Sequence, residues 1–501
     1  MTNPQVLIAG AGPTGLMLAL WLTRLGIRVR IVDPKSGPTR ETRAIAVQAR
    51  TMEFYDQLGL GEAALARGRD FHELSIWTQG HLRASVNLDG VGAGKTPHPN
   101  LYILTQDQNE ALLLSHLQTL GGEVDWQTEL TSFTQNEDGV TATLTHAGQP
   151  QIVQADYLAG CDGASSAVRR HLGVKLSGGT YPQRFYVADV TASGELRAND
   201  VNVSLDDDQF LAFFPMPGEH RHRIVGQLPP GTGKSATFET VRPQIDRQHI
   251  ATVEQVHWFS TYRVHHRVAD EFQIGRAFLL GDAAHVHSPV GGQGMNTGLG
   301  DAVNLAWKLA QAVRGQPAAL ATYGSERRPF AESLVNTTDR AFSSLVNPSP
   351  LARLVRIGLM PSLIKVLTRP RAVRRLAFLT LSQLRIYYPD SPLSAGQAGE
   401  VRGGDRLPWV PDGASSNFAA LRSLDWQVHV YGAPSPELLT WCGQHDLPLH
   451  VFVYGAAAKR ARLLEDAFYL VRPDGYVGLA LPEFGRSAAA TYAERWLTGH
   501  R

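Results

Sequence analysis

The sequence predicts an α/β protein with a mainly β domain inserted into its first α/β domain and a second α/β domain at its C-terminus. Residues 6–33 have the pattern of a buried strand, a glycine-rich turn, an apolar-periodic helix and a second strand. Between 181 and about 270 the pattern changes to short alternating strands divided by polar turns. With 501 residues the chain is also too long for one ordinary hydrophobic core. We therefore expect several domains.

The first element is a βαβ unit whose spacing is typical of dinucleotide binding. Gly10, Gly12 and Gly15 form a GxGxxG turn directly after the strand Val6 to Ala9, and Asp33 ends the second strand. Such glycines allow a tight turn, a close approach of the backbone to a pyrophosphate, and close packing of helix on strand. An acid at the second strand end accepts hydrogen bonds from a ribose. This Rossmann-like unit leaves NAD and FAD as alternatives.

Two later strand ends carry an acid beside a glycine, and they favour FAD. Asp162 and Gly163 follow a strand in ADYLAGCDGASSAVRRHLG, and Gly281 and Asp282 follow a strand in GRAFLLGDAAH. The ribityl chain of FAD is a polyol that NAD lacks, and it requires a fixed acceptor at a strand end, which Asp282 supplies. The glycine-rich run 291–294 then leads to a helix expected from about residue 301. Its backbone N–H groups would face the flavin N1/O2 edge, where negative charge develops on reduction.

The motifs GAGPTG, CDGASSAVRR and GDAAHVHSPVGGQGMN, in this order and at these separations, resemble the three signatures of the group A flavoprotein monooxygenases, which have the para-hydroxybenzoate hydroxylase fold. The segments TRETRAIAVQARTMEFYDQLGL and LYILTQDQNEALLLSHL extend the resemblance. HWFSTYRVHHRVADEFQIGR is similar to the phenol-hydroxylase-like branch. Together these stretches span roughly residues 1–340. The cofactor-binding residues that the motifs and the resemblance imply are Gly10, Gly12, Gly15, Asp33, Arg43, Gln106, Asp162, Gly163, Gly281, Asp282, Pro289, Gly292, Gly294, Met295 and Asn296.

The resemblance implies a monooxygenase in which FAD is reduced by NADH or NADPH, reacts with O₂ to a C4a-hydroperoxide and delivers a hydroxyl group to a phenolic or polyketide-type aromatic ring. Arg43 matches the family arginine near the isoalloxazine, and Pro289 matches the proline whose carbonyl faces the reacting ring. Because no second dinucleotide-binding unit follows the first, the nicotinamide is expected to bind transiently. The alternatives are a Baeyer–Villiger or antibiotic-modifying oxygenation, a flavin-dependent dehydrogenase or reductase without oxygen insertion, and a non-catalytic flavin-binding module.

The expected domains are an FAD-binding first part (1–180), a substrate-binding sheet (181–270), the completion of the FAD domain with a helical segment (271–390), and a C-terminal domain (391–501). Aromatic residues of the sheet are candidates to line the substrate pocket, namely Phe213, Phe214, Trp258 and Tyr262. By resemblance the last domain is thioredoxin-like. It has no CxxC motif, so its expected task is structural or dimer-forming.

Composition excludes several other classes. Lys+Arg 47 against Asp+Glu 46 leaves no field to attract nucleic acid. The two cysteines have no metal-ligand spacing, and the N-terminus has no signal-peptide or membrane-spanning run, so a cytoplasmic protein is expected. His285 and His287 have no further ligands nearby, so no metal site is expected. The basic segment 351–388 could lie on a membrane surface, but Pro361 and Pro370 interrupt it, and we favour a solvated or domain-packed face.

Overall fold

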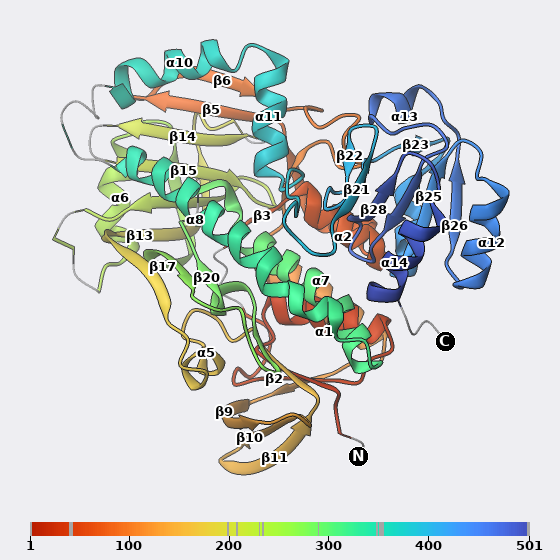
Figure 1. The fold of residues 1–501 in the computed structure, drawn as a ribbon. Helices are drawn as coiled ribbons and strands as arrows, with labels where there is room; N and C mark the ends of the chain where they lie inside the picture. The colour runs from red at the N-terminus through yellow and green to blue at the C-terminus, as the bar shows by residue number, and fades with distance from the viewer. Residues whose placement is uncertain are drawn as a thin grey trace.

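The computed structural model of the protein describes residues 3–39, 44–197, 200–206, 209–229, 231–232, 235–288, 290–346, 349 and 355–497. Figure 1 shows an eight-stranded sheet at the upper left, a three-stranded sheet of residues 128–155 at the bottom, and a separate α/β unit at the right. The long helices α7 (Gly294–Val313) and α8 (Tyr323–Val346) run between them.

The first sheet is mainly parallel, and it gathers the acid–glycine strand ends at one edge. Its strands, in spatial order, are β18 (Gln273–Ile274), β19 (Ala277–Leu279), β12 (Tyr157–Gly160), β1 (Val6–Ala9), β2 (Val29–Asp33) and β8 (Val124–Trp126). All neighbouring pairs are parallel except β18 with β19. The helices associated with this part are α1 (Pro13–Arg24), α2 (Ala49–Leu58), α3 (Gly61–Arg67), α4 (Gln106–Thr119) and α5 (Ala167–His171). Because the strands are buried and parallel, their carboxyl ends face the same side.

The second sheet has eight strands and includes a hairpin from outside the predicted range 181–270. In spatial order the strands are β20 (His285–Val286), β17 (Thr252–Ala269), β13 (Leu176–Ser193), β16 (Arg221–Gln227), β15 (Gln209–Pro215), β14 (Val201–Asp206), β5 (Glu73–Thr78) and β6 (His81–Asn87). The β5–β6 hairpin joins because β5 pairs in parallel with β14. The sheet is therefore assembled from separate stretches of chain.

Strand alternation gives this sheet two different faces. One face packs on α6 (Phe238–Asp246) through a core that includes Tyr186, Phe213 and Ile224. The opposite face, called the inner face here, carries Phe214 and Arg223 and contacts the chain at residues 44–45. Smaller sheets complete this part, namely β9 (Thr128–Gln135) with β10 (Val140–His146) and β11 (Gln149–Ala155), and β3 (Ala46–Val47) with β7 (Leu101–Ile103) and β4 (Arg69–Phe71).

Short helices follow α8, as the two prolines predict. A π-helical turn, η4 (Val355–Leu359), leads into α10 (Met360–Leu367), which has Pro361 in its first turn. Pro370 is the N-cap of α11 (Arg371–Leu381). Phe378 of α11 packs with Val91 and Leu101, so this helix is fixed against the first part of the chain.

The C-terminal unit is a mixed sheet with helices around it. Its strands, in spatial order, are β22 (Val401–Arg402), β21 (Ala395–Ala398), β28 (Val477–Leu481), β27 (Phe468–Val471), β25 (Gln427–Tyr431) and β26 (Leu449–Phe452). Its helices are α12 (Pro436–Gln444), α13 (Ala456–Arg460) and α14 (Arg486–Trp496), and a two-stranded ribbon joins β23 (Pro411–Asp412) to β24 (Ser415–Ser416). The paired strands 468–471 and 477–481 form a hairpin around Asp474 and Gly475. Trp307 of α7 belongs to the core of this unit, together with Trp426.

A buried network of charges joins the C-terminal unit to the helices of the first part. Glu326 of α8 accepts from Arg472 (Nη1 to Oε1, 2.8 Å) and from Lys308 of α7 (Nζ to Oε2, 2.8 Å). Arg472 also donates to Asp474 (Nη2 to Oδ2, 2.6 Å), and Asp474 accepts from Trp307 Nε1 at 3.0 Å. All four charged side chains are at most 1% exposed. The interface is therefore bridged by ion pairs that are buried from solvent.

Candidate functional site

The first glycine turn leaves room for a ligand where the protein itself supplies no atoms. Gly10 has a φ of +102°, and a Cβ there would lie 2.3 Å from the carbonyl oxygen of Cys161. A Cβ on Gly15 would lie 1.9 Å from the Gly10 oxygen, so strand and helix touch at this point. At Gly12, by contrast, a Cβ would meet no atom within 4 Å. The turn is closed towards the protein and open at the N-terminus of α1, where an anion is stabilised.

Asp33 lies at the end of β2, next to this turn. Its Oδ2 accepts from the Ala11 N–H at 2.8 Å and its Oδ1 accepts from the Lys35 N–H at 2.9 Å. The residue is 4% exposed. A carboxylate has about four acceptor positions, so these two bonds orient Asp33 and leave capacity for hydroxyl donors.

Asp162 follows β12, the neighbour of β1, and one of its oxygens lacks a partner. Oδ2 accepts from the N–H groups of Ala167 and Val168 at 2.7 and 3.1 Å. Oδ1 is buried and has no hydrogen-bond partner in the described part of the chain. Gly163 follows with a φ of +77°. A buried acceptor without a partner is costly, so a donor from outside the protein would be favoured here.

The third strand end is organised by a buried residue that we did not single out from the sequence. Asp301 of α7 accepts from the Gly281 N–H (3.1 Å), His285 Nε2 (2.7 Å) and Arg327 Nε (2.6 Å). Although burial would raise the pKa of the Asp301 carboxyl, Arg327 and His285 together hold it below its usual value. Asp282, in the short helix η1 (Gly281–Ala283), is exposed. Asp301 therefore fixes the loop, and Asp282 is presented at its surface.

A second buried cation ties the strand ends together. Arg169 of α5 donates to the carbonyl oxygens of Ala283 and Ala164, each at 2.8 Å. These bonds join the Asp162 loop to the Asp282 loop. Burial lowers the pKa of the Arg169 guanidinium, although Asp162 opposes the shift.

The glycine-rich run enters α7 earlier than the sequence predicts, because the helix begins at Gly294 rather than near residue 301. Gly292 has a φ of +60°. Asn296 accepts from the Gln48 N–H and the Thr51 hydroxyl, both at 2.8 Å. It also donates to the carbonyl oxygens of Ala46 and Gly292, at 2.9 and 2.8 Å. The helix can start within the glycine run because this amide fastens its first turn to the chain around residue 48.

The segment around residue 43, which carries part of the family resemblance, contacts the first turn of α4. Gln106, the first residue of α4, accepts from the Ala44 N–H at 3.4 Å and donates to Glu110 at 2.9 Å. Met295 receives a hydrogen bond from the Asn109 amide at its sulfur, at 3.4 Å. Arg43 and Pro289 lie outside the described residues.

The inner face of the second sheet carries a cluster of aromatic and charged side chains next to residues 44–45. Arg223 pairs with Asp189 through two bonds of 2.7 and 2.8 Å, and its Nη1 reaches the Ala44 carbonyl oxygen at 3.4 Å. The guanidinium lies 5.8 Å from the centre of the Trp258 ring. Phe214 packs against a cluster that includes Ile45. The sheet is therefore coupled directly to the chain at residues 44–45.

One of the aromatic candidates, Phe213, lies on the other face of the sheet. Phe213 is fully buried in the core beneath α6, so it cannot line a pocket on the inner face, and its assignment as a substrate contact is corrected. Tyr262 pairs with Phe185 on the same face of the sheet as Trp258, and it packs with Tyr181 and Val264. Neighbouring residues of one strand point to opposite faces, which explains why Phe213 and Phe214 differ.

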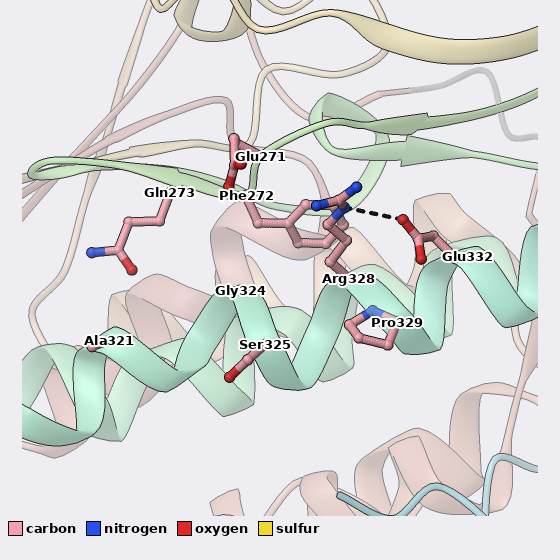
Figure 2. Close-up of a pocket in the computed structure, with 9 residues that line it drawn as sticks. All are labelled: Glu271, Phe272, Gln273, Ala321, Gly324, Ser325, Arg328, Pro329 and Glu332. Atoms are coloured by element: carbon pink, nitrogen blue, oxygen red, sulfur yellow. Dashed lines mark ion pairs between the residues drawn. The ribbon is translucent and has the colours of Figure 1, made fainter. Parts of the chain in front are cut away.

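A cavity elsewhere in the structure does not contain these groups. About 460 Å³ lie between residues 271–273 and α8, where Arg328 and Glu332 form an ion pair of 3.1 Å (Figure 2). No predicted cofactor or substrate residue lines it. We assign it no part in the reaction.

The three strand ends together fit FAD. The open turn at Gly12 suits a pyrophosphate, Asp33 suits a ribose, and the unpartnered Asp162 oxygen and exposed Asp282 supply acceptors that a ribityl-bearing dinucleotide can use. Among the described residues no cluster of His, Cys, Asp and Glu could hold a metal ion. The class that this fold and site define is an FAD-dependent oxidoreductase.

Comparison with known proteins narrows this class to a family. Residues 3–338 match the family described as FAD binding domain. A flavin-dependent monooxygenase of Mycobacteroides abscessus is 33% identical over 96% of this chain and 98% of its own length. The 6-methylpretetramide 4-monooxygenase of Streptomyces rimosus is 37% identical over 80% of this chain and 73% of its own. Among solved structures, the anhydrotetracycline hydroxylase OxyS from Streptomyces rimosus superposes with a TM-score of 0.80 at 29% identity, over 99% of both chains.

The chain belongs to this FAD-binding family, and it is an FAD-dependent monooxygenase. Its substrate is a small molecule, and O₂ is the second substrate. No helix in the described ranges is long and apolar enough to cross a lipid bilayer.

Proposed function

We propose that the protein hydroxylates a polyketide-type or phenolic aromatic compound with NADH or NADPH as the transient reductant. The observation that carries this proposal is the inner face, where Phe214 and Trp258 flank the buried Arg223–Asp189 pair next to residues 44–45. Aromatic walls bind a flat ring, and a buried charged pair orients its polar substituents. The names of the 6-methylpretetramide and anhydrotetracycline enzymes support a polycyclic substrate.

We propose that the cofactor is held by the strand ends. Bound FAD would supply two-electron transfer from the nicotinamide to O₂, with one oxygen atom inserted into the substrate and the other released as water. Gly10, Gly12 and Gly15 admit the pyrophosphate, Asp33 and Asp282 accept from ribose and ribityl hydroxyls, and Asp162 offers its free oxygen. Gly163, Gly281, Gly292, Gly294 and Asn296 shape the backbone around the cofactor, and Gln106, Met295, Arg43 and Pro289 complete the proposed contacts.

The proposal includes the wider organisation of the chain. The divisions 1–180, 181–270, 271–390 and 391–501 remain our proposed domains, with residues 73–87 contributed to the second sheet. A thioredoxin-like C-terminal domain, a cytoplasmic location and a homodimer are proposed with them. Burial raises the pKa of Cys442 to about 11, which supports a structural rather than a redox task for the last domain.

Substrate-dependent flavin reduction is the direct test of this function. FAD-loaded protein is mixed with NADH or NADPH, alone and with simple phenols or polycyclic aromatic polyketides, under isotopically labelled O₂. We expect one polycyclic compound to accelerate flavin reduction about tenfold or more and to gain one labelled oxygen on a ring carbon, because a bound aromatic substrate completes the site. Reduction without labelled product for any compound would contradict oxygen insertion. A labelled ester would indicate Baeyer–Villiger chemistry instead.

The Arg223–Asp189 pair is expected to position the chain beside the flavin rather than to react. The double variant Arg223→Met/Asp189→Leu removes both buried charges, so it avoids leaving one unpaired. We expect it to retain FAD but to release several-fold more hydrogen peroxide per NAD(P)H oxidised, since residues 44–45 lose their bond to the sheet. The measurement is peroxide yield against product yield at saturating substrate. Arg184→Met, which removes a bond to Thr261 in the same sheet, is the control. Unchanged coupling in the double variant would refute the positioning role.

A further inference from the structure

The outward side of α10, together with its N-cap residue Leu359, exposes a row of large apolar side chains. Leu359, Leu363, Val366 and Leu367 are 54%, 51%, 55% and 60% exposed. Their spacing of four, seven and eight residues from the first places them on one side of the helix. We call these four residues the α10 patch. Exposed apolar side chains are common singly, but a row of them on one helix marks an interaction surface.

The other side of α10 is already packed, so the helix is not free to turn the patch inward. Met360 and Ile364 pack against Ile76, Ala84 and Leu205 of the second sheet. Figure 1 shows α10 lying along the β5–β6 end of that sheet, at the top of the molecule. The helix thus has two apolar sides, one buried against the sheet and one facing outward. The outer side therefore needs a partner beyond this part of the fold.

The charge around the patch has one sign. Lys365, Arg369 and Arg371 are exposed beside it. The sequence contains no Asp or Glu between Arg340 and Asp390, although the whole chain has a net charge of only +1. Positive charge is thus concentrated where the apolar side chains are exposed. A surface that is apolar at its centre and negatively charged at its rim would complement it.

We propose that the α10 patch docks on the surface of an anionic lipid bilayer. The four apolar side chains enter the boundary between headgroups and acyl chains, and Lys365, Arg369 and Arg371 contact lipid phosphates. A second copy of the chain is a poorer occupant, because a symmetric pairing of two patches would bring their cations together. The sequence pattern favoured a solvated or packed face for this segment. The structure shows instead that the four side chains of the α10 patch are exposed.

Vesicle binding by the FAD-loaded full chain tests the proposal. Vesicles of phosphatidylcholine alone are compared with vesicles containing about one third phosphatidylglycerol, at low and high salt. We expect the protein to sediment with the anionic vesicles and to be released by salt. Leu363→Glu/Val366→Glu is expected to lower the bound fraction about tenfold, because two carboxylates would have to enter the interface. The matched control is Ile152→Glu/Val453→Glu, whose side chains are 64% and 77% exposed elsewhere, and it should bind as the parent does.

A second variant separates charge from apolar contact and does not depend on the first one folding. Lys365→Gln/Arg369→Gln/Arg371→Gln changes only exposed residues, and it should lose the preference for anionic vesicles. The proposal is overturned if the parent protein stays in the supernatant with both vesicle types, or if it binds both types equally and neither patch variant changes the binding. It is also overturned if sedimentation shows a dimer that Leu363→Glu/Val366→Glu converts to monomer, since the patch would then belong to a second copy.

Discussion

Gly12→Val is expected to abolish FAD retention while the chain remains folded. The Cβ position of Gly12 has no protein atom within 4 Å, so the fold has room for the new side chain. That space lies at the N-terminus of α1, where the pyrophosphate is proposed to sit, and a branched side chain would fill it. We expect affinity for FAD to fall at least about a hundredfold, which corresponds to about 2.7 kcal/mol.

The measurement is FAD content after gel filtration and affinity by flavin fluorescence, with circular dichroism to follow the fold. Gly443→Val in α12 is the matched control, because a Cβ there also meets no atom within 4 Å and the site lies in the C-terminal unit. The control should keep its FAD. If Gly12→Val binds FAD as tightly as the parent, the pyrophosphate does not approach this turn and the proposed cofactor position is wrong.

Arg472→Met is expected to destabilise the protein by about 3–5 kcal/mol, because it removes one partner from a buried charge network. Arg472 bonds to both Glu326 and Asp474, and all three are at most 1% exposed. Lys308 remains beside Glu326, but the buried Asp474 carboxylate loses its ion pair with Arg472. The loss should appear as a lower free energy of unfolding in urea.

The control for this variant is Arg462→Met, which removes an Arg–Glu pair on the surface of the same unit. Arg462 and Glu400 are 65% and 62% exposed, so their pair should contribute no more than about 1 kcal/mol. We also expect limited proteolysis to release the C-terminal unit from Arg472→Met sooner than from the parent. Equal unfolding free energies for the two variants would mean that the buried network does not hold the interface.

The local motifs allowed the first sheet and its strand ends to be predicted, because each signal lies within a few residues. Gly10 to Gly15 and the acids at 33, 162 and 282 are at strand ends and turns as expected. The sequence predicts too late a start for α7, because a glycine run does not indicate a helix on its own. The first turn of α7 is helical because Asn296 forms hydrogen bonds with residues 46 and 48. These residues are distant in the sequence, so no local pattern predicts the contact.

The parts that were not predicted depend on long-range pairing. The β5–β6 hairpin joins the second sheet through β14, which lies more than a hundred residues further along the chain. The choice between Phe213 and Phe214 as a pocket residue depends on strand register, because one residue of slip exchanges the two faces. Asp301 could have been noticed as an acid within an otherwise apolar helix, a pattern that usually requires buried partners.

The charge network also limits how this chain can be recombined with its relatives. The backbone carbonyl oxygen of Asp474 accepts a hydrogen bond from Arg50 of α2 at 2.7 Å. The residue just before α2 is Gln48, which donates a hydrogen bond to the glycine loop. The final hundred residues are thus connected through α2 to the glycine loop at the proposed flavin site. A chimera that takes its C-terminal unit from another member of the family would need matching residues at 50, 307, 308 and 326, and those positions should be exchanged as one set.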